Sequence, residues 1–242
     1  MSATLRFDVV TLFPDIFAGY LGASFIGRAV EGGQLAFRFR SPRDFGLGKH
    51  RSVDDTPYGG GSGMIMRVDV IVATMESLDA EASREPRAHR VLLTPQGRVL
   101  DQRRVRELAS RPAVMLVCGR YEGFDDRISA FTDEQLSLGD FVMTGGEVAA
   151  MAIIDACARL LPGVLGNQAS TVDESHNPET GGLLEYPQYT RPVEFRGVRV
   201  PEVLQGGHHA DIEQWRREQA IARTRERRPD LWERFCRNRQ EP

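Results

Sequence analysis

The chain has 242 residues, of which 41% are hydrophobic, so it can bury a full core as one large domain or two modest ones. Its net charge of -3 excludes a strong global attraction to nucleic acid, but Lys49 is the only lysine and all other cationic residues are arginines. The guanidinium fork of arginine binds phosphates and base edges well, although codon bias in a GC-rich genome also increases the number of arginines.

Cysteine use and apolar runs exclude two further classes of protein. Cys118, Cys157 and Cys236 are far apart and lack CxxC spacing, so neither a disulfide framework nor a zinc site is indicated, and a cytoplasmic location fits. The N-terminus has no signal-peptide pattern. The longest apolar segment, residues 148–162, is interrupted by charges and too short to span a bilayer, so we predict no membrane association.

Strand and helix patterns alternate through the first two thirds of the chain. We predict first a strand over 6–13, a helix from Pro14 to the glycines at 32 and 33, a strand over 35–40 and a polar glycine-rich loop over 41–63. There follow a helix over about 68–81, a strand over 90–95 and a helix over 101–110 with Asp101 as its N-cap. The series ends with a strand over 113–119, a short polar helix, a strand ending at Met143 and a helix over 147–161. This rhythm predicts an α/β fold with a mostly parallel sheet and helices on both faces.

The last third has a different character. Residues 163–210 are rich in Gly, Pro and polar groups and have little periodicity. Such a stretch is too long for an idle loop in a compact domain, so we interpret it as a functional lid or an interdomain linker. Residues 211–238 look helical and contain more arginines than carboxylates. They predict a small helical domain that either contacts RNA or presents a solvated face.

Three successive predicted strands end in glycine-bearing turns, TPQGR (94–98), CGRYEGFDDR (118–127) and SLGDFVMTGGE (137–147). Ligands of α/β proteins bind beyond the carboxyl ends of parallel strands, so these turns could line a cleft with backbone amides and carbonyls. No P-loop is present, which favours a nucleoside without phosphates, such as S-adenosylmethionine. The simpler interpretation is that the glycines only make turns.

Other features allow a functional and a purely structural interpretation. The run DDTPYGGGSGM (54–64) is either a flexible linker or, given Tyr58 and its acidic neighbours, a base-binding loop that orders on contact. Arg159 either interacts with the dipole at its helix's C-terminus or has a chemical role. Asp173 and Glu174 are either solvated loop carboxylates or catalytic groups. The five histidines have no metal-ligand spacing, so we predict no metal site.

Together the motifs resemble the bacterial tRNA (guanine-N1)-methyltransferase family of the SPOUT superfamily. The resemblance rests on YGGGSGM, LTPQGR, CGRYEGFDDR, LGDFVMTGGE, ARLLPGVLGN, GLLEYPQYTRP and RRPDLW, in this order, and covers nearly the whole chain. It implies a deep trefoil knot, a rare exception to normal chain topology. Close passage of chain segments in such a knot would explain why Gly145 and Gly146 carry no side chains.

The resemblance also implies a domain organisation and partners. Residues 1–162 would form the knotted S-adenosylmethionine-binding α/β domain, residues 163–187 a flexible lid or linker, and residues 188–242 a C-terminal helical domain that binds tRNA. The protein would be a homodimer whose active site is shared between subunits. Arginines from two chains could then bind RNA despite the negative net charge.

Two groups of binding residues are predicted, the cofactor-binding group by motif match to the family and the substrate-binding group from the interpretation of residues 54–64 as a base-binding loop. The predicted cofactor-binding residues are Leu93, Pro95, Gly97, Gly119, Glu122, Leu138, Gly139, Asp140, Phe141, Val142, Met143, Gly145 and Gly146. The predicted substrate-binding residues are Asp54, Asp55, Tyr58, Gly59 and Gly60.

The implied reaction methylates N1 of the guanine at tRNA position 37, next to the anticodon. That nitrogen carries a proton, so a carboxylate general base is expected, and Glu174 occupies the position where the family usually has Asp. Asp173 competes for this role if the loop register shifts. Arg159 matches the arginine that stabilises charge on O6.

Magnesium dependence is possible, but no ligand cluster is apparent. A second departure is LQGGHHADI, which leaves the RNA contacts there in doubt.

Two other functions remain open at this point. A SPOUT methyltransferase acting on ribosomal RNA or on a ribose 2′-hydroxyl would need no base for guanine, but would not be expected to combine YGGGSGM with GLLEYPQYTRP. A non-enzymatic RNA-binding regulator could keep the knot and lose catalysis, although Arg159 and both carboxylates are retained here.

Overall fold

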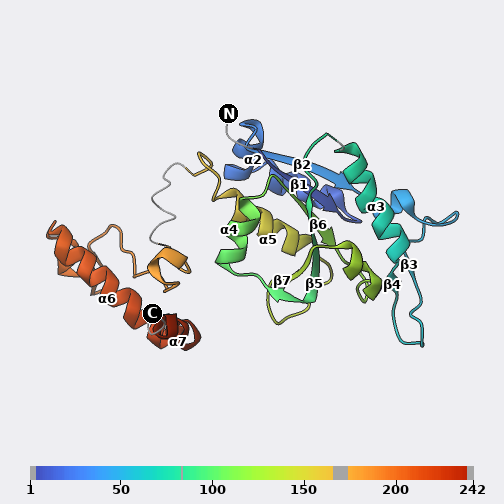
Figure 1. Cartoon of the computed structure of the whole chain (residues 1–242). Coiled ribbons are helices and arrows are strands. Elements are labelled where there is room, and N and C mark those ends of the chain that lie inside the picture. Colours follow the sequence, from blue (N-terminus) through green and yellow to red (C-terminus); the bar gives the residue numbers. More distant parts are fainter. Residues whose placement is uncertain (1–3, 83, 166–173, 239–242) are drawn as a thin grey trace. The chain divides into compact units, whose positions relative to one another are not determined.

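The computed structural model describes residues 4–82, 84–165 and 174–238. The chain divides into two compact units, Met1–Gly166 and Asn167–Pro242. The first unit is a layered α/β structure and the second is built largely from two helices (Figure 1).

The described part of the first unit contains a five-stranded sheet in the order β2-β1-β6-β5-β7. All neighbouring strands in it are parallel, which confirms the predicted α/β fold with a mostly parallel sheet. The central strands of the sheet, residues 5–10 and 113–118, are buried along their whole length. The second of them is a continuous apolar run, as expected of a strand covered on both faces, whereas the first also buries Arg6 and Asp8. The strands are β1 (Leu5–Val10), β2 (Leu35–Arg40), β5 (His89–Val99), β6 (Ala113–Cys118) and β7 (Glu134–Ser137).

Helices cover both faces of this sheet. The described helices are α1 (Ala18–Leu21), α2 (Ser24–Glu31), α3 (Val68–Glu81), α4 (Gln102–Ala109) and α5 (Glu147–Ala158), with 3-10 helices at Pro14–Phe17, Pro42–Phe45 and Asp126–Phe131. A small antiparallel pair, β3 (Asp54–Asp55) and β4 (Ile65–Met66), lies outside the main sheet.

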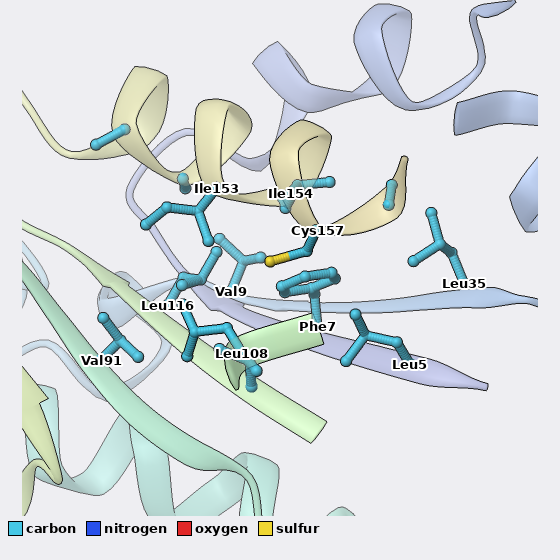
Figure 2. Packing of buried hydrophobic residues seen from close by; sticks show 14 of the residues in the cluster. Leu5, Phe7, Val9, Leu35, Val91, Leu108, Leu116, Ile153, Ile154 and Cys157 are labelled. Atoms are coloured by element: carbon cyan, nitrogen blue, oxygen red, sulfur yellow. The ribbon is translucent and has the colours of Figure 1, made fainter. Parts of the chain in front are cut away.

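Successive buried apolar residues along β5 and β6 belong in turn to two separate core clusters. Phe7 and Val9 belong to the cluster that includes α2, α4 and α5, and Figure 2 shows Ile153 and Cys157 of α5 lying over them. Strand residues that face the other side of the sheet, such as Met115 of β6, pack with α3 in the second cluster. The period of two along each strand therefore decides which helix layer a side chain meets.

Several local predictions are confirmed, but the first predicted helix is wrong. β2 and α3 have the predicted limits, and the Asp101 carboxylate accepts a hydrogen bond from the Arg104 N–H at 2.8 Å as the N-cap of α4. The single helix predicted from Pro14 is instead a 3-10 turn followed by α1 and α2. The break lies at Ala23, whose backbone is extended after Gly22 ends α1.

The strand predicted to end at Met143 is also wrong, because β7 ends at Ser137. The Ser137 hydroxyl donates to the Gly139 carbonyl at 2.9 Å and accepts from the Gly139 N–H at 3.1 Å, so the chain turns back at once. The apolar residues that follow do not pair in the sheet: Phe141 is 55% exposed and Val142 83% exposed. The apolar residues after Ser137 therefore do not form a strand; Phe141 and Val142 line a pocket instead.

The second unit confirms the helical prediction for residues 211–238 but divides it in two. Its elements are β8 (Glu194–Phe195), β9 (Val198–Arg199), 3-10 turns at Pro178–Thr180 and Glu202–Leu204, and the helices α6 (His209–Arg227) and α7 (Pro229–Asn238). The break is at Arg228, because the residue before a proline is disfavoured in the helical conformation. Thr224 is fully buried and its hydroxyl accepts from the Leu184 N–H at 2.9 Å, which joins the preceding loop to α6.

Candidate functional site

A pocket of about 170 Å³ lies beside residues 93–95 of β5 and at the carboxyl ends of β6 and β7, where the glycine-bearing segments predicted a cleft. Each of the three segments contributes to its wall, but the turn predicted at residues 94–98 is wrong: this segment belongs to β5, which continues to Val99 past a register shift between Leu93 and Arg98. Apolar side chains, backbone groups of the turns and a few charged side chains line it, which is the usual composition of a small-molecule site.

Most of the residues predicted to bind a cofactor line this pocket. They are Leu93, Pro95, Gly119, Glu122, Leu138, Phe141, Val142, Met143, Gly145 and Gly146. Gly97, Gly139 and Asp140 do not line it. Gly97 instead packs on the backbone of β7, since an added Cβ would lie 2.5 Å from the Leu136 nitrogen. Gly139 serves the turn that ends β7.

The prediction from sequence missed several lining residues. They are Thr94, Arg120, Tyr121, Gly123, Phe124, Leu136, Ser137, Thr144 and Ala149. Most of them alternate with predicted residues in the same three turns, so including each whole turn, rather than its glycines and matched positions, would have found them.

Gly145 and Gly146 allow the start of α5 to lie directly against the end of β6. An added Cβ on Gly146 would be 2.8 Å from the Cys118 Cα and 3.1 Å from the Gly119 nitrogen, and the Gly146 N–H donates to the Gly119 carbonyl at 3.0 Å. An added Cβ on Gly145 would be 2.6 Å from both the Arg120 Cδ and the Glu147 Oε2. Gly146 is therefore needed for a close backbone approach, and Gly145 leaves room for the side chains of Arg120 and Glu147.

A buried ion pair supports this edge of the pocket. Glu147, 1% exposed, lies 3.0 Å from the Arg120 guanidinium and accepts a hydrogen bond from the Thr11 hydroxyl at 2.8 Å. The same guanidinium lies over the Phe13 ring, 4.6 Å from its centroid. Burial, reinforced by the charge of Glu147, raises the pKa of the Cys118 thiol well above its ordinary value, so this cysteine is not a nucleophile at neutral pH.

The glycine-rich run forms the loop between β3 and β4. Tyr58 is 99% exposed, and Gly59 and Gly60 have φ of +85° and +79° with open space around them. Asp55 is paired with Arg67 at 2.9 Å. Asp54 pairs in register with Met66 across the short ladder. The predicted substrate-binding residues thus lie together on one hairpin, with the aromatic ring in solvent.

This hairpin is attached to the pocket wall by backbone hydrogen bonds. The Glu122 N–H donates to the Met64 carbonyl at 3.0 Å, the Met66 N–H donates to the Gly123 carbonyl at 2.9 Å, and the Asp125 N–H donates to the Met66 carbonyl at 3.0 Å. The glycine-rich loop and the turn after β6 therefore form one hydrogen-bonded assembly.

The predicted catalytic residues fall in different units. Arg159 is the C-cap residue that follows α5 in the first unit, where its N–H donates to the Asp155 carbonyl at 3.2 Å. Glu174 belongs to the second unit and is partly buried; its backbone carbonyl accepts from the Asn177 N–H at 3.4 Å. Asp173 lies outside the described residues.

Within residues 4–82, 84–165 and 174–238, no group of three or more His, Cys, Asp or Glu side chains could hold a metal ion. None of the described helices is both long and apolar enough to cross a bilayer.

Known proteins resemble this chain over almost its whole length. The family model for tRNA (Guanine-1)-methyltransferase TrmD matches residues 5–234. The chain is 64% identical over 246 residues to a tRNA (guanine-N(1)-)-methyltransferase of Sorangium cellulosum, covering 94% of this chain and 93% of that protein. Proteins of the same name from Anaeromyxobacter dehalogenans and Gloeobacter violaceus are 54% and 53% identical; they cover 96% and 94% of this chain, and the matches span 92% and 98% of those proteins. The chain therefore belongs to the tRNA (guanine-1)-methyltransferase family of enzymes.

Proposed function

We propose that this enzyme transfers a methyl group from S-adenosylmethionine to N1 of the guanine at position 37 of tRNA. The observation that carries the proposal is the pocket at the ends of β5, β6 and β7, which brings together most of the residues expected to bind the cofactor. The names of the relatives support the nitrogen and the RNA class, since each is called a tRNA (guanine-N(1)-)-methyltransferase.

The chemistry of the pocket fits this cofactor. Apolar residues such as Leu93 and Leu138 offer a surface for adenine, and the backbone of the turns offers donors and acceptors for a nucleoside. The carboxylate of Glu122 has no hydrogen bond or ion pair with another described residue, so it is available for a cationic ligand. When bound, S-adenosylmethionine would supply an electrophilic methyl group. Arg120 is already paired with Glu147, which leaves Glu122 as the available charge.

We further propose that the pocket loops form the trefoil knot expected for the superfamily. Two close backbone approaches support it: Gly146 against Cys118, and Gly97 against the backbone of β7. Both put segments from different parts of the sequence in contact at distances that a side chain would prevent.

In the proposed reaction a carboxylate takes the proton from guanine N1 as that nitrogen forms its bond to the methyl group. Glu174 is our first choice for this base, and Asp173 is its competitor. Arg159 would donate to O6 as negative charge grows there, because a guanidinium stays charged and donates in a fork. Glu174 and Arg159 belong to different units of the chain.

Substrate binding is assigned to the hairpin and to the second unit. The exposed Tyr58 ring and the open glycines beside it suit contact with a base that has left its stack. The arginines of α6 and α7 would contact the tRNA backbone, and a homodimer in the cytoplasm would share each site between subunits. Magnesium dependence is implied by the resemblance, and we assign no residues to the ion.

The test is methyl transfer from labelled S-adenosylmethionine to two tRNA transcripts that carry guanine or adenine at position 37. We expect transfer to the guanine transcript alone, and loss of transfer mainly in Glu174→Gln. Loss mainly in Asp173→Asn would keep the reaction and move the base by one residue. Transfer to neither transcript by the wild type would contradict the proposed function.

A further inference from the structure

Gly63 leaves open a space that the side chain of Glu122 fills. A Cβ added to Gly63 would lie 2.6 Å from the Glu122 Oε1 and 2.8 Å from its Cδ, and closer still to its Cγ. Gly63 also has φ of +86°, in the left-handed region that favours glycine. Gly63 itself does not line the pocket, whereas Glu122 does.

The backbone around Glu122 is fixed, and this sets the point from which its side chain starts. Its N–H donates to the Met64 carbonyl, one residue beyond Gly63. Its two neighbours, Tyr121 and Gly123, both have positive φ, at +58° and +110°. The turn is therefore shaped on both sides of Glu122 and hydrogen-bonded to the hairpin, and the side chain lies over the bare α-carbon of Gly63.

We propose that Gly63 is a positioning residue for cofactor binding: its missing side chain lets Glu122 hold its carboxylate at the pocket, where it meets the positive charge of S-adenosylmethionine. This inference rests on the proposed function. Any side chain at position 63 meets flexible atoms of Glu122 rather than backbone, so the carboxylate would move while the fold is kept. The glycine-rich hairpin thereby contributes to the cofactor site through Glu122 as well as to the RNA site.

The matched control is Gly48, which has φ of +66° and nothing within 4 Å of an added Cβ. Gly63→Ala and Gly48→Ala carry the same kind of backbone strain, so we expect similar falls in melting temperature. Isothermal titration calorimetry with S-adenosylmethionine and no RNA should show about tenfold weaker binding for Gly63→Ala, the effect expected of one misplaced charge-assisted contact, and about twofold or less for Gly48→Ala.

Two variants of Glu122 complete the test. Glu122→Gln keeps the shape and removes the charge, so it should weaken binding about as much as Gly63→Ala does; wild-type affinity in this variant would overturn the proposal even if Gly63→Ala did not fold. In a Glu122→Ala background, Gly63→Ala should cost no further affinity, because no side chain is left to displace. A further loss of the same size there would show that Gly63 acts through the loop and not through Glu122.

These outcomes separate the inference from the proposed function. No binding of S-adenosylmethionine by the wild type would contradict the function itself. Wild-type binding together with equal affinities of Gly63→Ala and Gly48→Ala would overturn only the role of Gly63.

Discussion

Arg120 and Glu147 join the pocket wall to the first turn of α5 through an ion pair of 3.0 Å whose carboxylate is almost fully buried. The acid also lies at the N-terminus of α5, where the helix dipole favours a negative charge. One side-chain pair thus connects the turn after β6, the start of a core helix and, through Thr11, the end of β1.

Breaking this pair should destabilise the protein. Glu147→Gln keeps the volume and the hydrogen bond from Thr11 but leaves Arg120 without its charge partner. We expect a loss of about 2 kcal/mol in the free energy of unfolding, below the full cost of a broken buried pair because Arg120 is partly exposed. Urea denaturation measures it, with exposed Glu76→Gln on α3 as a control expected to change stability by less than about 0.5 kcal/mol. Equal stability of the two variants would contradict the prediction.

Gly146→Ala should separate the start of α5 from β6. The added Cβ meets backbone atoms of Cys118 and Gly119, which cannot rotate away, so we expect a loss of about 2 kcal/mol or more and weaker S-adenosylmethionine binding. Gly19→Ala is the control, because Gly19 lies in α1 with nothing within 4 Å of an added Cβ. Alanine there should be neutral or stabilising by about 0.5 kcal/mol. A Gly146→Ala protein with wild-type stability and affinity would show that the contact is not tight.

The charge on Asp101 should contribute stability that depends on pH. Burial acts to raise the pKa of this carboxyl, but the Arg104 N–H and the charges of Arg98 and Arg103 outweigh it, so the pKa is lowered from 3.8. A lowered pKa in the folded state means stability that is present above the unfolded pKa and is lost as pH falls through the folded one. Asp101→Asn keeps a capping oxygen, so its deficit relative to wild type should be largest above pH about 5 and shrink below pH about 4. Urea titrations across this range would contradict the prediction if the deficit were constant.

The three cysteines should differ in reactivity. Burial raises the pKa of Cys157 to about 12, and the pKa of Cys118 is also raised by burial, whereas Cys236 is partly exposed on α7. An aromatic disulfide reagent at pH 8 should therefore modify Cys236 first in the native protein and all three thiols in denaturant. Cys236→Ser should abolish the rapid native reaction. Rapid modification of Cys118 in that variant would show that the pocket end of β6 opens readily.

Arg159→Lys tests the fork proposed to bind O6. Lysine keeps the charge but cannot donate in a planar fork, so we expect kcat for methyl transfer to fall by roughly 10- to 100-fold with little change in cofactor affinity. Arg43→Lys, at an exposed arginine of the same unit, is the control and should leave kcat unchanged. Unchanged kcat in Arg159→Lys would remove this arginine from the proposed mechanism.

Local signals were predicted well where they depend on neighbours in the chain. The limits of α3 follow from apolar spacing, and the start of α4 follows from the Asp101 cap. The wrong strand ending at Met143 has the opposite origin: Phe141 and Val142 are apolar because they line the pocket, and a pattern of apolar residues does not reveal whether the backbone pairs in a sheet.

The sequence by itself determined the family, the alternation of strands and helices, and the three glycine-bearing segments that line the pocket, because ordered motifs and periodicity are properties of the chain alone. Only the tertiary structure decided that β6 lies between β1 and β5, that Glu147 meets Arg120, and that Glu122 fills the space left by Gly63. The physical reason is that these contacts join residues far apart in the chain, and long-range strand order and backbone approach, rather than local preference, bring them together.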